Sequence, residues 1–283
     1  MTRQFILLIT CADRPGIVAG VAQCIAEQGG NILESAQYSD EASGTFFMRV
    51  AFAPPETLTE EAFCATFDPV AARFSFKWQL HDAARKMRAA IMVSQGGHCL
   101  NDLLYRTSTG RLAMEVASVI SNHQTWQRRV EHENIAYHYL PVTPETKIEQ
   151  EEALAALLED QAVDLVILAR YMQVLSDDLC RKWSGRIINI HHSFLPGFKG
   201  AKPYHRAHDR GVKMVGATAH YVTGDLDEGP IIAQDVSVVD HADGVEEMIA
   251  QGQDTESRVL ARAIKAHIEH RVLLNGNRTV VFK

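Results

Sequence analysis

Two segments, IINIHHSFLPGFKG (residues 187–200) and GATAHYVTGDLDEGP (residues 216–230), are the most informative part of the sequence. The first begins as a short apolar strand that ends in Asn189-Ile190-His191. Side chains alternate faces along a strand, so Asn189 and His191 point the same way. The second segment ends in an acidic turn that contains Asp225 and Asp227. We therefore expect a carboxamide, an imidazole and a carboxylate to meet where this strand opens into a loop.

These three groups suit direct attack on a carbonyl carbon. An imidazole exchanges protons near pH 7, and an amide N–H can stabilise an oxygen that gains negative charge. A covalent intermediate is not indicated, because Ser193 lacks a G-x-S-x-G setting. A metal site is not indicated either. The histidines and acids of this region do not match the ligand spacings of known metal-binding motifs. His191 and His192 are adjacent on a strand, so their side chains point to opposite faces.

Strands and helices alternate around this segment. Apolar runs predict strands at residues 89–94, 116–121, 136–140, 164–168, 187–191, 214–222 and 231–238. Helical patterns begin at residue 101 and cover 148–160 and 244–271, and Asn275-Gly276 predicts a hairpin over 272–282. This alternation predicts a Rossmann-like, open and mostly parallel α/β sheet, whose ligands bind beyond the carboxyl ends of its strands.

The first eighty residues read differently. This region predicts the order βαββαβ of a ferredoxin-like unit. The predicted strands are residues 5–9, 31–38, 45–52 and 74–80, and the predicted helices follow Pro15 and cover residues 58–67. A polar, basic bridge follows at residues 81–88. We therefore predict two domains, residues 1–84 and residues 85–283.

Composition narrows the classes of function. There are 28 Lys and Arg against 35 Asp and Glu, a net charge of −7, which disfavours nucleic acid as a partner. The five cysteines are scattered and odd in number, as in a reducing compartment. The N-terminal apolar run is too short for a signal peptide, and no run approaches a membrane span. We expect a cytoplasmic protein that does not associate with membranes.

The segment LLITCADRPGIVAGVAQCIAEQGGNILESAQYS (residues 7–39) resembles the opening of an ACT domain, a small regulatory module that commonly binds amino acids between paired copies. The resemblance implies a homo-oligomer, with an effector site near Asp13, Gly16 and Asn31. Free helix N–H groups there could receive a carboxylate. Glycine and methionine are the candidate effectors. The alternative is that these residues only shape turns and the module serves assembly.

The second domain resembles the folate-dependent formyltransferase family, through residues 167–176, 188–204 and 216–234. The resemblance implies that Asn189, His191 and Asp227 are catalytic, with Asp225 two residues too far from the Gly-Pro pair. It makes 10-formyltetrahydrofolate the substrate, with no separate cofactor. The implied slot for its pterin consists of Met172, Gln173, Val174, Leu175, Val222, Thr223 and Gly224.

Three features resemble the branch of this family that transfers the formyl group to water. They are the N-terminal ACT module, His192 at a position where the transferases commonly have proline, and the segment HCLNDLLYR (residues 98–106). The turn after the first strand, residues 94–98, lacks the Gly-Ser-Asn pattern that holds an acceptor phosphate. We expect hydrolysis to formate and tetrahydrofolate, which balances folate pools and supplies formate for purine synthesis. The alternatives are transfer to glycinamide ribonucleotide, methionyl-tRNA formylation, which the net charge disfavours, and a non-catalytic folate or amino-acid sensor.

Overall fold

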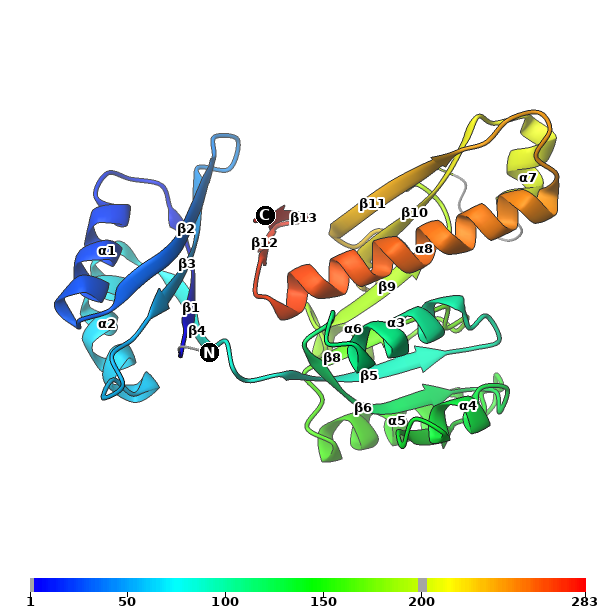
Figure 1. The fold of residues 1–283 in the computed structure, drawn as a ribbon, viewed down its shortest axis with the longest axis horizontal. Coiled ribbons are helices and arrows are strands. Elements are labelled where there is room, and N and C mark those ends of the chain that lie inside the picture. Colours follow the sequence, from blue (N-terminus) through cyan, green and yellow to red (C-terminus); the bar gives the residue numbers. More distant parts are fainter. Residues whose placement is uncertain (1–2, 198–202) are drawn as a thin grey trace. The chain divides into compact units, whose positions relative to one another are not determined.

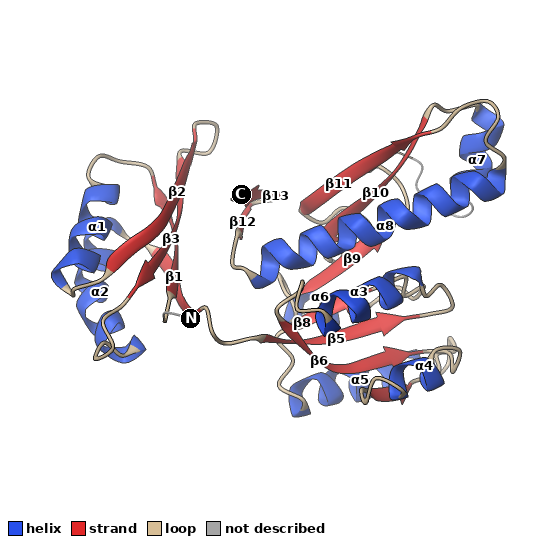
Figure 2. Ribbon diagram, in the orientation of Figure 1, coloured by secondary structure: helices blue, strands red, loops and turns tan. Residues whose placement is uncertain are grey.

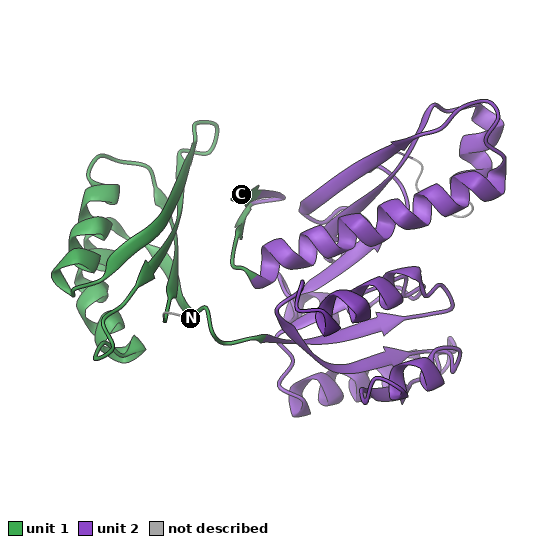
Figure 3. Cartoon of the chain, in the orientation of Figure 1, with its two compact units in different colours: residues 1–86, 269–275, 280–283 green, residues 87–268, 276–279 purple. Residues whose placement is uncertain are grey.

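The computed structural model describes residues 3–197 and 203–283, so part of the motif at 188–204 lies outside the described residues. The chain forms two compact units (Figures 1 and 3). Unit 1 contains residues 1–86, 269–275 and 280–283, and unit 2 contains residues 87–268 and 276–279. The boundary predicted from the sequence falls after residue 84 and assigns the whole C-terminus to the second domain. In the structure, most of the last fifteen residues belong to unit 1.

Unit 1 is a ferredoxin-like fold, as the sequence predicts. Its elements are β1 (Phe5–Ala12), α1 (Ile17–Glu27), β2 (Asn31–Asp40), β3 (Thr45–Ala53), α2 (Glu60–Phe74) and β4 (Lys77–Asp82). The antiparallel sheet has the order β2-β3-β1-β4. Helix α2 extends past its predicted end at residue 67, with Pro69 inside it. The helix continues because Phe67, Ala71 and Phe74 recur at helical spacing and are all buried.

The two faces of this sheet are covered differently. Both helices contribute to the hydrophobic core on one face, where the rings of Phe52, Phe63 and Phe67 pack in succession. On the other face Leu273 and Phe282, from the end of the chain, pack with residues of β1 and β3. The sequence gives no local signal for this return, because it depends on contacts between residues more than two hundred positions apart.

Unit 2 is built on a seven-stranded sheet of order β11-β10-β9-β8-β5-β6-β7. Five strands are parallel: β5 (Met87–Val93), β6 (Met114–Ser121), β7 (Ala136–Tyr139), β8 (Leu165–Leu168) and β9 (Ile187–His191). Strands β10 (Met214–Tyr221) and β11 (Ile231–Val238) extend the sheet in antiparallel fashion. The predicted mostly parallel α/β sheet is therefore confirmed.

Helices lie on both faces of this sheet (Figure 2). They are α3 (His98–Ser108), α4 (Gln127–Glu131), α5 (Lys147–Asp160), α6 (Asp177–Lys182), α7 (Pro203–Arg210) and α8 (Val245–Ile268). Helices α5 and α6 bury Leu154 and Leu179 against Ala90 and Met92 of β5. Helix α8 contacts β9, β10, β11 and α3. Among the described residues, no helix is long and apolar enough to cross a lipid bilayer.

The chain ends in the predicted hairpin, β12 (Val272–Asn275) and β13 (Arg278–Val281). Gly276 has a φ of 59°, the left-handed conformation that an Asn-Gly turn supplies without steric cost.

Strand order also determines where a ligand can bind in unit 2. The chain winds from β5 outward through β6 and β7, and then returns to the other side of β5 through β8 and β9. The carboxyl ends of β5, β8 and β9 lie at this reversal, which is where open α/β sheets bind ligands. In β9, Asn189 is in register with Leu168 of β8 and with His220 of β10.

Candidate active site

A pocket of about 380 Å³ opens at the carboxyl ends of β8 and β9. Three segments line it: the loop after β8, the end of β9, and the segment from His220 to Asp227. All ten residues predicted for catalysis and folate binding are among its lining residues: Asn189, His191, Asp227, Met172, Gln173, Val174, Leu175, Val222, Thr223 and Gly224. The structure therefore brings this predicted set together in one cavity.

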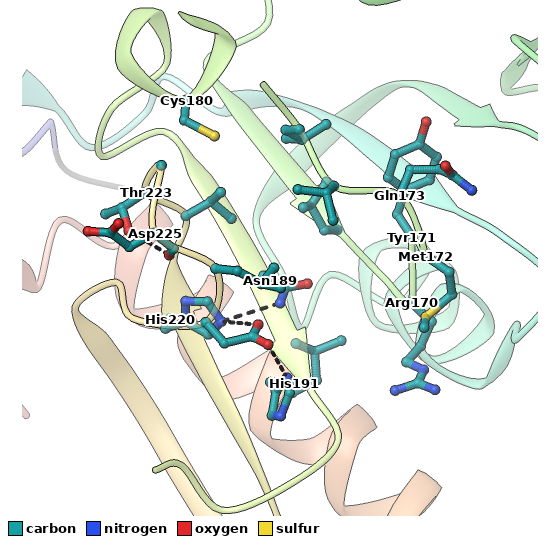
Figure 4. A pocket seen from close by; sticks show the side chains of 18 of the residues that line it. Arg170, Tyr171, Met172, Gln173, Cys180, Asn189, His191, His220, Thr223 and Asp225 are labelled. Carbon is teal, nitrogen blue, oxygen red and sulfur yellow. Dashed lines mark hydrogen bonds and ion pairs between the residues drawn. The ribbon is translucent and has the colours of Figure 1, made fainter. Parts of the chain in front are cut away.

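Four polar side chains form a connected array along one wall of the pocket (Figure 4). His191 Nδ1 lies 3.2 Å from Asp227 Oδ2, and His220 Nε2 lies 3.6 Å from Asp227 Oδ1. Asn189 Nδ2 lies 3.3 Å from His220 Nε2. The carboxylate thus joins two imidazoles, and the carboxamide joins the array through the second of them.

The partners of each ring assign its protons. His220 Nδ1 lies 3.0 Å from the Tyr221 carbonyl oxygen, which can only accept, so Nδ1 is protonated. Its Nε2 accepts from Asn189 when the ring is neutral and donates to Asp227 when the ring is charged. His191 directs Nδ1 at Asp227, which leaves its buried Nε2 without a hydrogen-bond partner among the described residues. Nε2 is therefore the His191 atom that remains for the substrate.

Asp227 is held as an anion. Hydrogen bonds from His191 and then His220 keep the pKa of its carboxyl well below the ordinary value, although partial burial acts in the opposite direction. Its backbone has a φ of 57°, in the left-handed region that Asp and Asn tolerate better than most residues. A conformation that costs energy and aims a charge at two histidines is consistent with a functional position.

The loop that carries Asp227 folds back tightly on β10. Tyr221 N–H donates to the Pro230 carbonyl at 2.9 Å. A Cβ added at Gly229 would lie 1.8 Å from the Tyr221 carbonyl oxygen, so only glycine fits there. This close approach is the physical reason that the Gly-Pro pair accompanies the acid. Asp225 also lines the pocket, but Figure 4 shows its side chain turned away from His191 and His220.

The rest of the pocket is apolar and open to solvent. Met172, Val174 and Leu226 are 60%, 55% and 64% exposed, although each is a large hydrophobic side chain. Such an exposed apolar rim with a few convergent polar groups suits a flat heteroaromatic ligand. Leu226 was not among the residues predicted from the sequence.

Sequence reasoning missed His220, which is 2% exposed and central to the array. The feature that identifies His220 is the pairing of strands β10 and β9, which puts His220 opposite Asn189. That register joins residues 31 positions apart and cannot be read from a single strand. Arg170, at the edge of the same pocket, was missed as well.

The turn after β5 is filled by the protein itself. Trp126 Nε1 donates to the Gln95 carbonyl at 3.1 Å, and a Cβ added at Gly97 would lie 2.0 Å from the indole. The Ser94 hydroxyl donates to Asn122 at 2.7 Å and accepts from Met172 N–H at 3.0 Å. Ser94 and the indole are thus committed to internal contacts, which leaves this turn poorly suited to holding a phosphate.

Behind the pocket, a buried carboxylate gathers partners from three segments. Glu256 of α8 is 1% exposed and accepts from His98 at 2.8 Å and from Tyr204 at 2.7 Å. Arg170 Nε lies 3.5 Å from it. Burial raises the pKa of Glu256, but the hydrogen bond from His98 and the charge of Arg170 outweigh burial and lower it overall. Cys99 lies close enough to complete a three-ligand metal set. The adjacent Arg170 cation opposes that use, and the expected lack of a metal stays a prediction.

Comparison with known proteins agrees with this geometry. A family described as formyl transferase matches residues 87–264, and the ACT domain family matches residues 5–67. The chain is 48% identical over 283 residues to a formyltetrahydrofolate deformylase of Corynebacterium sp. (strain P-1), with 99% of this chain and 98% of that protein covered. The crystal structure of a formyltetrahydrofolate deformylase from Pseudomonas syringae pv. tomato str. DC3000 has a TM-score of 0.97 at 47% identity, covering 100% of this chain and 95% of that one. The chain belongs to the formyltetrahydrofolate deformylase family.

Transferases share part of this architecture. Glycinamide ribonucleotide transformylase 1 from Symbiobacterium toebii has a TM-score of 0.66 at 32% identity, covering 70% of this chain and 95% of that one. The fold of the catalytic unit is therefore common to deformylases and transferases. Both resemblances expected from the sequence, to the ACT domain and to the formyltransferases, are confirmed.

Within one copy of the ACT domain, the three residues predicted for the effector site do not lie close together. Asp13 follows β1, donates its N–H to the Gly44 carbonyl at 2.9 Å and accepts from the Ser39 hydroxyl. Gly16 lies near it and caps α1 with a φ of 92°. Asn31 begins β2 opposite Ala53, at the other end of the strand from Ser39. Within one copy, Asn31 therefore lies apart from the other two, because the strand between them is extended.

Proposed function

We propose that the protein hydrolyses 10-formyltetrahydrofolate to formate and tetrahydrofolate. The observation that carries the proposal is the array of Asn189, His220, Asp227 and His191 along one wall of an exposed apolar pocket. The names of the full-length relatives support the same reaction. The filled turn after β5 favours water over a phosphate-bearing acceptor, since Trp126 closes over Gly97.

The catalytic roles follow from the free atoms of the array. Asn189 faces the pocket and would donate to the formyl oxygen as it gains charge, while His191 directs its Nδ1 proton at Asp227 and offers Nε2 as a proton acceptor. Asp227 stays ionised, orients the attacking water and stabilises the charged imidazole. His191 Nε2 accepts one proton from the water as the carbon–oxygen bond forms, and the resulting imidazolium is stabilised by Asp227. Nε2 then returns this proton to the folate nitrogen as the carbon–nitrogen bond breaks.

The folate slot is proposed on the same pocket. Residues 172–175 and 222–224 line it from two loops, and Met172 and Val174 present exposed apolar side chains there. The pterin would lie between these two loops, and the formyl group would then point toward β9. The first of these loops is fixed where it ends, since the Ser176 side chain caps α6 and the Ser176 N–H donates to Glu151 at 2.9 Å.

One assay tests the reaction. Pure protein is incubated with 10-formyltetrahydrofolate without any acceptor, and formate and tetrahydrofolate are both quantified. Equal release of the two products is expected. Release only after an amine acceptor is added would indicate a transferase. No release under either condition, with folate still bound, would indicate a sensor.

We further propose that the ACT domain mediates assembly and binds an amino acid, with glycine and methionine as candidates. Asp13 and Gly16 mark one end of the sheet and Asn31 the other. A site that uses all three therefore needs a second copy of the chain, which favours a homo-oligomer. Such control would balance folate pools and supply formate for purine synthesis. Titration of each amino acid against formate release and oligomer mass tests this. No response in either measurement would leave the domain a structural part only.

A further inference from the structure

His192 lines the same pocket as the array but has no role in the mechanism above. Its buried Nδ1 has no hydrogen-bond partner within the described ranges, 3–197 and 203–283. His191 Nε2 is in the same condition, and the two rings are adjacent, with centroids 4.8 Å apart and planes tilted by 54°. Buried polar atoms without partners are rare in native proteins and commonly mark a place for water or substrate.

The surroundings of His192 keep its ring neutral. The charged and titratable groups around it are Arg170, His191, Glu256, Asp227 and Tyr204. Burial, followed by the positive charge of Arg170, lowers the pKa of His192 to about 4. A neutral imidazole has one protonated and one unprotonated nitrogen, so it can accept a hydrogen bond as well as donate one.

The Arg170 cation is fixed in place. Its backbone has a φ of 66°, and its carbonyl accepts from Ser94 N–H at 3.2 Å. Its guanidinium lies 3.5 Å from the buried Glu256 carboxylate, which His98 and Tyr204 also hold. This charge network gives a permanent cation beside His192, and a cation there opposes protonation of the ring.

We propose that His192 is a second histidine of the reaction centre, whose neutral Nδ1 accepts a hydrogen bond from the attacking water. This role rests on the proposed hydrolysis, because the reaction needs a water next to the formyl carbon. A water that donates one proton toward His191 Nε2 and the other to His192 Nδ1 directs its oxygen lone pairs at a third point, the formyl carbon. The first proton leaves as described above. The bond to His192 only orients the water, so the ring stays neutral throughout.

Substitutions at residue 192 test the atom as well as the residue. The Asn side chain can place its amide oxygen near the position of Nδ1, whereas the amide of Gln extends toward that of Nε2. His192→Asn should retain turnover close to wild type. His192→Gln and His192→Leu should lower kcat about 10²-fold, as expected when a reacting group is misplaced. The KM and the affinity for tetrahydrofolate should change little, because the slot residues are untouched.

The matched control is His241→Leu, the same change at an exposed histidine, which should leave kcat unchanged. Circular dichroism and thermal melting verify folding, and His192→Gln keeps a polar side chain should the Leu variant fail to fold. Wild-type kcat in His192→Gln would overturn the proposal. An equal loss of kcat in the Asn and Gln variants would also overturn the proposal, because the proposal depends on the position of the hydrogen-bond acceptor and not only on a polar side chain. Failure of the proposed hydrolysis can be distinguished from failure of the His192 proposal, because in the first case the wild-type protein itself would release no formate.

Discussion

The pocket of the catalytic unit and the β1–α1 turn of the ACT domain both lie where a strand ends, yet they differ in how many segments they assemble. The pocket receives side chains from the loop after β8, from β9 and from the β10 loop. The turn offers Asp13 and Gly16, while Asn31 lies at the far end of β2. The first site is therefore complete in one copy, whereas the effector site that we propose would need a partner copy to bring its three residues together.

The two carboxylates show the same difference. Asp227 is held by two imidazoles, and its pKa is lowered by them. Asp13 is exposed, and its carboxylate accepts from one hydroxyl, that of Ser39. A carboxylate fixed by two partners is preorganised for chemistry, whereas an exposed one is better placed to receive a ligand or a neighbouring copy.

The strongest test of the preorganised site is Asp227→Asn. Asparagine tolerates the positive φ of this position, so the fold should persist. The neutral amide neither orients the water as an anion nor stabilises the charged imidazole. Formate release should fall by about 10³–10⁴-fold, while titration should find tetrahydrofolate binding largely intact. Near-normal turnover in this variant would contradict the assignment of Asp227 as a catalytic residue.

Asn189→Ala removes the carboxamide from the same wall. Loss of one oxyanion donor should lower kcat by about 10²–10³-fold, with a small effect on KM. The measurement is steady-state formate release at saturating folate. A rise in KM at constant kcat would instead place Asn189 in substrate binding.

His220→Leu tests the residue that only the strand pairing revealed. It removes the partner that joins Asn189 to Asp227. A lost hydrogen bond to a charged group is worth about 1.5–3 kcal/mol, so turnover should fall roughly 10–100-fold. His220→Gln, whose amide approaches the position of Nε2, should lose less. Equal activity of wild type and the Leu variant would show that the array works without its middle member.

The pH dependence of stability should also separate wild type from Asp227→Asn. The folded pKa of Asp227 lies below the ordinary value of 3.8, so its charge stabilises the fold above that pH. This contribution is lost as pH falls through the lowered folded pKa. The difference in urea midpoint between the two proteins should therefore be larger at about pH 6 than at about pH 3. A constant difference would mean that the carboxylate is not held as the geometry indicates.

The smallest effect on turnover is expected for Asp13→Asn in the ACT domain. Formate release without amino acid should match wild type, because the change lies outside the pocket. A response to glycine or methionine, where the wild type has one, should weaken. Asn31→Ala should weaken it similarly if paired copies complete the site. A response lost in one variant and intact in the other would show that the two residues do not share a ligand.

Local patterns carried much of the prediction. Alternation along β9 was enough to place Asn189 and His191 on one wall, because side-chain direction in a strand depends only on the neighbouring dihedral angles. The Asn-Gly turn predicted the final hairpin for the same reason. The Gly-Pro spacing selected Asp227 over Asp225 through the family resemblance, and the close approach at Gly229 supplies its physical cause.

The sequence by itself thus determined the two fold types, the succession of their strands and the main polar residues of the pocket, but not the short helices α4, α6 and α7. The tertiary structure alone decided that His220 joins them, that Trp126 fills the turn after β5, and that Glu256 holds Arg170 beside His192. It also decided that the chain end returns to the ACT sheet and that Asn31 lies apart from Asp13. The physical reason is distance along the chain. Dihedral preferences act between neighbours, whereas strand register and burial join residues tens to hundreds of positions apart.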